Sequence, residues 1–441
     1  MNIIKTKKLK VTREEKSWIM YDWANSAYAT IMMAAVFPIY FTNVADSAGQ
    51  PGDYWWGLGS AGAMIIVALI APVAGAFSNF LGYRKKMFCF FLVIGVGFTF
   101  ASAFVDSWVL LLCGYAISHV GFSLSCLVYD SCLVDVTKPE RMDKISGYGF
   151  AFGYIGGSTI PFLFSIALIT FGNSFGIGTT LAIRISVAVT AVWWAVFTIP
   201  FLKNVHQRYG TEKPKDHAVV RAAFHAVIKT AKKIIKDKRI FVFLLAFFFY
   251  IDGVGTVIKM ATSYGATLGL DTTSMILALF VTQLVAFPCS IWFAELARRF
   301  GSLTMIRAAV CVYLLICSTG FVMGFGLEEG YFGVDTAIIL FWALAGMVGT
   351  VQGGIQAISR SYFCQIVPPD NVGEFFGFFD IFGKFAAVLG PLLYSLTKGF
   401  TGRSSFSILC IIALFIIALI ILGAGNKYLT APKPGPDSDG N

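Results

Sequence analysis

The sequence predicts an all-α membrane protein in which twelve transmembrane helices form two repeats of six. Three observations lead to this fold class: the composition, the spacing of long apolar stretches, and an internal repeat. Hydrophobic residues make up 57% of the 441 residues and charged residues only 13%. A soluble fold cannot bury so much apolar surface, so lipid is the expected solvent for most of the chain.

Apolar stretches of about 18 to 26 residues recur along the chain, and each is long enough to cross a hydrocarbon core of about 30 Å. Helices are expected because backbone polar groups in lipid must be satisfied within the segment. The predicted spans are 18–41, 55–77, 87–105, 109–133, 147–171, 180–202, 240–266, 273–296, 304–325, 335–358, 375–397 and 405–424.

Residues 139–165 and 369–395 are two copies of one pattern at a constant offset of 230. The same offset places Asp22 on Asp252, so we expect two acids at matched depths in the two halves. Parallel repeats of apolar helices with buried ionisable groups are typical of secondary transporters. The identical pairs are Pro139/Pro369, Gly147/Gly377, Phe152/Phe382, Gly153/Gly383, Pro161/Pro391, Leu163/Leu393 and Ser165/Ser395.

The basic residues predict the orientation. Of the 34 Lys and Arg, only Lys398 and Arg403 fall in loops on one side, and Arg184, Lys259 and Lys384 fall within spans. All the others, Arg360 included, are assigned to loops or termini on the opposite side. By the positive-inside rule both termini and the central loop are cytoplasmic. The expected units are an N-terminal segment (1–17), a first half (18–202), a linker (203–239), a second half (240–424) and a disordered tail (425–441).

The linker contains an amphipathic pattern. Apolar residues from Val220 to Ile234 recur at helical spacing, opposite basic residues from Arg221 to Lys236. This predicts a helix along the inner membrane surface, and a tether between the halves is an equally compatible interpretation.

Composition also excludes several classes of function. The net charge of +10 is spread over loops at one face, which disfavours a nucleic-acid-binding protein. The four His show no metal-ligand grouping, so neither a metal nor any other cofactor is expected, and the protein is predicted not to be an enzyme. The nine Cys lie in or beside apolar spans, so no disulfide framework is implied. The expected partners are a small-molecule substrate, protons and the lipid bilayer, and the default state is a monomer.

Charged and polar groups at membrane depth need a partner, a water-filled cavity or a function. Some have an obvious structural alternative: Asp22 can anchor a helix end, and Asp380 and Lys384, four residues apart, can form a neutral pair. Arg184 is expected to pair with a carboxylate of another span or to contact substrate. The Asp252–Lys259 pair is the strongest candidate site. The residues singled out from the pattern alone are Asp22, Asn25, Tyr129, Asp130, Arg184, Asp252, Lys259, Asp380 and Lys384.

Several strings resemble the vacuole effluxer (autophagy-related) family of the major facilitator superfamily, also called the unknown major facilitator family. They are YDWANSAYATIMMAAVFPIYF (21–41), SGYGFAFGYIGG (146–157), AVWWAVFTIP (191–200), FYIDGVGTVIK (249–259), VQGGIQAISRSYFCQIVPP (351–369) and EFFGFFDIFGKFAAVLGP (374–391).

The resemblance implies alternating access around a central cavity lined by the first, fourth, seventh and tenth spans. Carried onto this sequence, it adds Thr256, Gln352 and Gln356 to the candidate residues. It also implies a gating loop between the second and third spans, with Gly75, Asn79, Gly82 and Arg84 as its residues. The superfamily usually has an acid where Asn79 stands. Asn79 can still bond to a helix end, but charge-based gating by this loop is in question.

The sequence thus predicts a permease that moves a small polar solute, with amino acids or related zwitterions favoured and proton coupling expected. The alternatives are a carrier of sugars or lipid-like amphiphiles, and a membrane sensor or scaffold that does not transport. A bacterial cytoplasmic membrane is the expected location, or a vacuolar membrane in a eukaryote.

Overall fold

The computed structural model describes residues 10–213, 219–267, 269 and 272–430. Twelve helices in this part of the chain are long and apolar enough to cross a membrane, and each overlaps one of the predicted spans. The predicted fold class is therefore confirmed. In the first half the elements are α1 (Arg13–Tyr28), η1 (Ala29–Ala35), α2 (Phe37–Ser47), α3 (Gly52–Asn79), α4 (Arg84–Ser102), α5 (Trp108–Ser131), α6 (Leu133–Val136), α7 (Pro139–Phe152), η2 (Gly153–Thr159), α8 (Ile160–Phe171), η3 (Gly172–Phe175) and α9 (Thr179–Asn204).

The second half follows a linker helix. Its elements are α10 (Val219–Lys236), α11 (Lys238–Thr267), α12 (Thr272–Phe300), α13 (Ser302–Glu328), α14 (Val334–Ile366), η4 (Pro369–Asn371), α15 (Val372–Thr401), α16 (Ser404–Ala424) and α17 (Asn426–Leu429).

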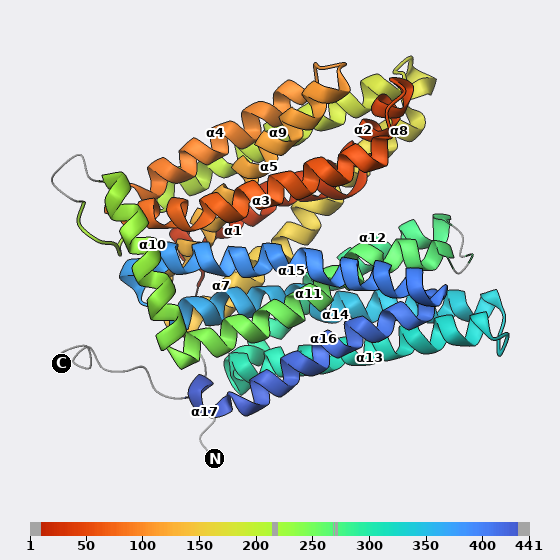
Figure 1. The fold of residues 1–441 in the computed structure, drawn as a ribbon. Helices are drawn as coiled ribbons and strands as arrows, with labels where there is room; N and C mark the ends of the chain where they lie inside the picture. Colours follow the sequence, from red (N-terminus) through yellow and green to blue (C-terminus); the bar gives the residue numbers. More distant parts are fainter. Residues whose placement is uncertain (1–9, 214–218, 268, 270–271, 431–441) are drawn as a thin grey trace.

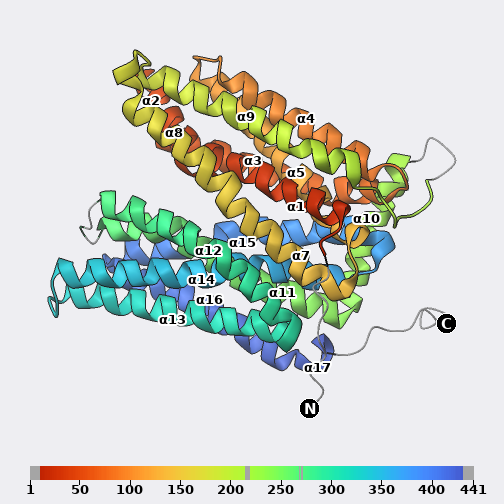
Figure 2. The ribbon, with the colours of Figure 1, turned by 180° about the vertical axis from the view of Figure 1, so that it is seen from behind.

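The helices form two elongated bundles, α1–α9 and α11–α16, which lie together at one end and diverge toward the other (Figures 1 and 2). We call the end at which α1 begins and α16 ends the base. Across the two halves, α3 packs against α15, and α7 packs against α12 and α14. The residues that hold the base together are therefore the first place to look for a functional arrangement.

Glycines allow the close approach of α3 and α15. A Cβ at Gly75 would lie 2.2 Å from the carbonyl oxygen of Gly373, and one at Gly377 would lie 2.6 Å from the Cα of Pro72. Side chains at these positions would force the two helices apart. Small residues serve this purpose in lipid, where helices associate by packing rather than by a hydrophobic drive.

Two spans of the first half are interrupted by π-helical segments. In η1 the Val36 amide bonds to the Ile31 carbonyl, and in η2 the Ile160 amide bonds to the Ile155 carbonyl. Each segment precedes a proline near the start of the next helix (Pro38 and Pro161), where the missing N–H releases a carbonyl of the preceding turn. The repeat is thus imperfect in structure, because α11 and α15 continue as α-helices.

The linker forms a helix, α10, that crosses the base from one bundle to the other (Figures 1 and 2). It packs on α3, α11 and α15. The prediction of a disordered tail from residue 425 is wrong at its start. There, α17 places Leu429 in a buried position, and its carbonyl accepts a 3.0 Å bond from the Tyr362 hydroxyl. The rest of the predicted tail, residues 431–441, lies outside the described residues.

Candidate functional site: charged contacts at the base and a buried polar group above them

A guanidinium from the second half bonds to two carboxylates of the first half. Arg360 of α14 lies 3.0 Å from an oxygen of Asp22 in α1 and 2.8 Å from an oxygen of Asp130 in α5. Its Nε donates a 2.9 Å bond to the Ser146 hydroxyl in α7. We call these four residues the Arg360 cluster. It ties three helices of one half to one helix of the other.

Aromatic rings surround the cation. The Arg360 guanidinium carbon lies 4.6 Å from the ring centres of Trp18 and Phe150 and 5.5 Å from that of Tyr129. Trp18 also donates a 3.1 Å bond to the Tyr129 carbonyl, which fixes the rings relative to each other. Arg360 is almost fully buried. The buried guanidinium keeps its two carboxylate partners and its contacts with the ring faces only while the base is closed.

The assignment of Arg360 to a loop is wrong, because α14 continues to Ile366 and carries it as a buried helical residue. The polar string Ser359–Arg360–Ser361 breaks the apolar pattern of the tenth span and was the available signal. Its partners could not be read from sequence, because they lie 214 or more residues away in the chain.

The expectation that Asp22 and Asp252 lie at matched depths is also wrong. A side-chain oxygen of Asp22 lies against Gly149, ten residues after the start of α7 at Pro139. Asp252 instead contacts Gly390, eighteen residues after the start of α15 at Val372. In the register of the repeat, at an offset of 230, Gly390 corresponds to Ile160, which is eleven residues beyond Gly149, so Asp252 lies roughly 16 Å farther from the base. The shared offset of the two acids is not a structural equivalence.

The predicted gating loop makes a second contact across the halves. The Asn79 side chain donates a 2.9 Å bond to Glu374 and accepts a 2.8 Å bond from the Gly373 amide. The Asn79 side chain therefore accepts a hydrogen bond from a backbone amide in the first turn of α15, as expected for a polar residue at a helix end. The charge of this contact comes from Glu374, which sequence analysis did not single out. Thr230 of α10 donates to the other oxygen of Glu374.

Two other residues of that loop act within the first half. Gly82 has φ +78°, which suits the tight turn between α3 and α4. Arg84 forms a buried ion pair with Asp135, which also accepts bonds from the amides of Arg208 and Tyr209. In the second half, Arg298 stands at the position that Asn79 has in the first half, and it is bonded to Glu295 of its own helix at 2.5 Å. These pairs brace each half and do not join the two halves.

Asp143 of α7 makes a third contact across the base that sequence analysis missed. It accepts bonds from the hydroxyls of Ser302 and Ser361 and a 3.2 Å bond from Gln365, all in the second half. The repeat gave no indication of it, since Gly373 stands at the corresponding position of the second half. The three inter-half contacts together make the closed base a polar interface.

A separate polar group lies on α11, farther from the base. Asp252 is fully buried, and one of its oxygens accepts a 2.8 Å bond from the Gly390 amide of α15. Its other oxygen is without a hydrogen-bond partner among the described residues. Thr256, one turn along, is bonded to the Asp252 carbonyl at 2.8 Å. Lys259, on the same helix, is exposed. A buried carboxyl oxygen free to take a proton or a donor is unusual.

Asp380 and Lys384 lie in the middle part of α15, with Lys384 Nζ 3.8 Å from an Asp380 oxygen. The other Asp380 oxygen has no hydrogen-bond partner in the described part of the chain. His119 of α5 is buried, with Ser123 3.5 Å from one ring nitrogen. Groups of both signs therefore lie on α11 and α15, and α15 packs against both α11 and α5.

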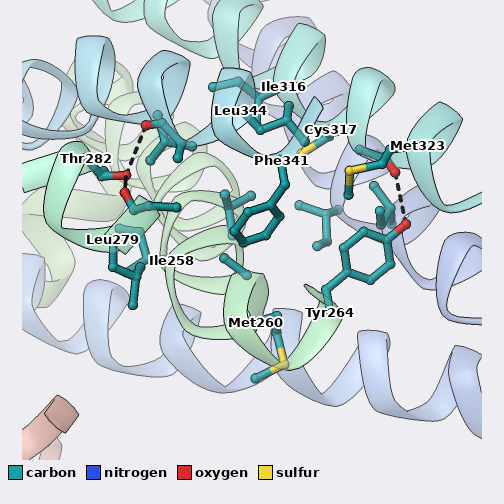
Figure 3. A pocket seen from close by; sticks show the side chains of 18 of the residues that line it. Ile258, Met260, Tyr264, Leu279, Thr282, Ile316, Cys317, Met323, Phe341 and Leu344 are labelled. Carbon is teal, nitrogen blue, oxygen red and sulfur yellow. Dashed lines mark hydrogen bonds between the residues drawn. The ribbon is translucent and has the colours of Figure 1, made fainter. Parts of the chain in front are cut away.

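The glutamines of α14 lie one helical turn apart. Gln356 donates a 3.1 Å bond to the Gln352 carbonyl. Gln352 also borders an apolar cavity of about 120 Å³ inside the second bundle, between α11, α12, α13, α14 and α16 (Figure 3). Tyr264 and Phe341 point into the space between these helices, and Tyr264 is bonded to the Gly320 carbonyl at 2.9 Å.

Arg184 lies apart from all these groups. Its partner is the exposed Asp106 in the loop after α4, with the Tyr40 hydroxyl 3.4 Å away. The expected partner was a carboxylate of another span, so that expectation is corrected. The remaining predicted residue, Asn25, is buried in α1 one turn from Asp22. In the described residues no group of three or more potential metal-ligating side chains occurs.

Comparison with known proteins identifies the family. Residues 134–426 match the family model described as "Vacuole effluxer Atg22 like". The chain belongs to the Atg22-like vacuole effluxer family. A Bacillus subtilis (strain 168) protein described as the uncharacterized MFS-type transporter YxiO is 43% identical over 418 residues, which is 93% of this chain and 94% of that protein.

A fungal member, autophagy-related protein 22 of Cryptococcus neoformans, is 25% identical over 64% of this chain. The chain spans about half the length of that relative (52%). The YxiO protein is described as a transporter and the family as vacuole effluxers, which confirms that this Atg22-like chain is a transporter and not an enzyme.

Solved structures share the fold. A bacterial homologue of the iron transporter ferroportin in an outward-facing state has a TM-score of 0.66 at 14% identity, covering 94% of this chain and all of that one. The human organic anion transporter MFSD10 has a TM-score of 0.64 at 16% identity, covering 93% and 98%. At these identities the likeness shows the major facilitator fold alone.

Proposed function

We propose that this secondary transporter moves amino acids or related zwitterions by alternating access, coupled to protons. The observation that carries the substrate class is a set of four charged residues away from the ends of α11 and α15. It contains two acids (Asp252 and Asp380) and two bases (Lys259 and Lys384), and α15 packs against α5 of the first half. A zwitterion presents one ammonium and one carboxylate, so groups of both signs near each other suit it.

The proton step rests on Asp252. Burial disfavours the charged form of a carboxyl group, and a nearby lysine favours it. One oxygen of Asp252 accepts a backbone bond and the other has no hydrogen-bond partner among the described residues, so the carboxyl group can exchange a proton for a substrate ammonium. Asp380 offers a second such oxygen beside Lys384. Binding of substrate and binding of a proton would then compete for the same carboxyl groups.

Alternating access rests on the base. Three polar contacts join the halves there: the Arg360 cluster, the Asn79–Glu374 contact and the Asp143 contact. The base is also the side to which the basic loops belong, so we propose that it faces the cytoplasm and that both termini are cytoplasmic. In this orientation the structure is a state closed to the cytoplasm. We place the protein in a cell membrane. Transport requires all three contacts to separate in the opposite state.

The test is uptake by proteoliposomes with and without a pH gradient, for a panel of amino acids, dipeptides and sugars. Accumulation of one zwitterion that depends on the gradient is expected for the wild type. Asp252→Asn should abolish the dependence on the gradient, and Asp335→Asn, at an exposed acid at the start of α14, should leave it intact. Gradient-dependent uptake by Asp252→Asn at the wild-type level would overturn the coupling role of Asp252.

An amphiphilic substrate is the second candidate, and the cavity of Figure 3 favours it. That space is lined almost wholly by apolar side chains, with Gln352 at its border. Ligands that raise the thermal unfolding midpoint of the purified protein distinguish the candidates, because binding to the folded state stabilises it by mass action. A shift with amphiphiles and none with zwitterions would favour the second candidate.

A further inference from the structure

The linker helix α10 has three different faces. Ala223, Thr230 and Ile234 recur at spacings of seven and four and are buried against the bundles. The other two faces are exposed. One carries three large apolar residues and the other carries four lysines. The apolar residues are Phe224, Ile228 and Ile235, and the lysines are Lys229, Lys232, Lys233 and Lys236.

Spacing places these sets on distinct sides of one helix. Phe224 and Ile228 are four residues apart and Ile228 and Ile235 are seven apart, so they form one stripe. Lys229, Lys232 and Lys236 form a neighbouring stripe by the same rule. The apolar residues are 53%, 56% and 69% exposed, respectively. A single exposed apolar side chain is ordinary, but a stripe beside a basic stripe is typical of helices at an anionic membrane surface.

The position of α10 fits that partner. It ends at Lys236, two residues before the transmembrane helix α11 begins at Lys238, so it lies at the level where the bundle enters the bilayer. In both views it runs across the base rather than away from it (Figures 1 and 2). Negatively charged phospholipid headgroups are the complement of the lysine stripe, and the acyl region beneath them is the complement of the apolar stripe.

The buried face of α10 connects this surface to the closed base. Thr230 donates to one oxygen of Glu374, and Asn79 donates to the other. One carboxylate of the second half is thus held by the linker helix and by the first half together. Separation of α3 from α15 breaks the Asn79 bond and removes part of the surface on which Thr230, Ala223 and Ile234 are buried.

We infer that α10 is a binding site for anionic phospholipid, and that lipid bound there stabilises the state in which the base is closed. The inference uses alternating access but not the identity of the substrate. Lipids hold α10 flat across the base through its lysine and apolar stripes. In that position its third face meets both halves and supports the Glu374 contact.

A native cysteine reports opening of the base. Cys364 of α14 is 3% exposed, and its sulfur lies 3.9 Å from the Asp130 carbonyl of the other half. A hydrophilic maleimide reaches it only when the halves separate. The full chain is placed in nanodiscs of phosphatidylcholine with or without phosphatidylglycerol, and labelling at Cys364 is followed by site-resolved mass spectrometry.

Phosphatidylglycerol should slow labelling of Cys364 in the wild type by about fivefold. This factor corresponds to the attraction of one surface lysine to anionic lipid, and we take it as the total gained by the four lysines when α10 is docked. Neutralising the four lysines of α10 to glutamine should remove this effect. Neutralising four exposed lysines elsewhere at the base should not. The control lysines are Lys85, Lys86, Lys138 and Lys427.

Thr230→Val separates lipid binding from its consequence. Spin-labelled phosphatidylglycerol should bind this variant as it binds the wild type, while the protection of Cys364 is lost. Equal loss of protection in the control lysine variant would mean that any lysines at the base attract the lipid, and it would overturn the inference. The absence of any effect of phosphatidylglycerol on the wild type would also overturn it. Asp22→Asn/Asp130→Asn must raise Cys364 labelling in the same discs. If it does not, alternating access at this base is what has failed.

Discussion

Replacing Arg360 by lysine tests the closed base most directly. Lysine keeps the positive charge but loses the planar fork that reaches Asp22 at 3.0 Å, Asp130 at 2.8 Å and Ser146 at 2.9 Å. One ammonium cannot reproduce these three directions from the same backbone position, and it stacks less well on Trp18. The closed state should therefore lose at least one charge-assisted bond, whereas the open state loses none.

A buried hydrogen bond to a charged group contributes about 1.5–3 kcal/mol. A loss of about 2 kcal/mol raises the population of the open state about 30-fold relative to the closed state, while the closed state remains the major one. Because labelling of Cys364 requires opening, its rate should increase by the same factor in Arg360→Lys.

The control is Arg184→Lys, the same change at an ion pair with Asp106 in an exposed loop of the first half. It should leave Cys364 labelling unchanged. Thermal unfolding of both variants shows whether the fold is intact, because a partly unfolded protein also exposes Cys364. A folded Arg360→Lys protein with labelling within twofold of the wild type would refute the role assigned to the Arg360 cluster.

Three further changes test other contacts. Asn79→Asp places a second carboxylate against Glu374 and should speed Cys364 labelling on the order of tenfold by like-charge repulsion. Adding Glu374→Gln should restore the wild-type labelling rate. Labelling of the double variant that stays fast would contradict the explanation. Gly75→Val adds atoms 2.2 Å from the opposing backbone and should open the base in the same labelling assay, whereas Gly62→Val, with nothing within 4 Å, should not. Asp252→Asn retains an oxygen for its backbone bond, so its unfolding midpoint should stay near that of the wild type while the ratio of substrate uptake at pH 6 to that at pH 8 moves to about one.

Sequence alone determined the architecture. Twelve apolar stretches fix twelve helices because lipid leaves the backbone no other partner, and the repeat at an offset of 230 fixes two halves. The helical pattern of the linker and the role of Asn79 at a helix end could also be predicted. Each of these depends on local periodicity or on a short motif.

Only the tertiary structure decided which charges meet. Arg360 finds its carboxylates 338 and 230 positions away, and Asp143 finds its donors in the second half. Asp22 and Asp252, equal in the repeat, lie at different depths because α1 and α11 are placed differently along the repeated helices α7 and α15. Hydrophobicity sets where a helix sits in the bilayer. The rotation and axial shift of one helix against another depend on packing between distant segments, which the order of residues in each segment does not encode.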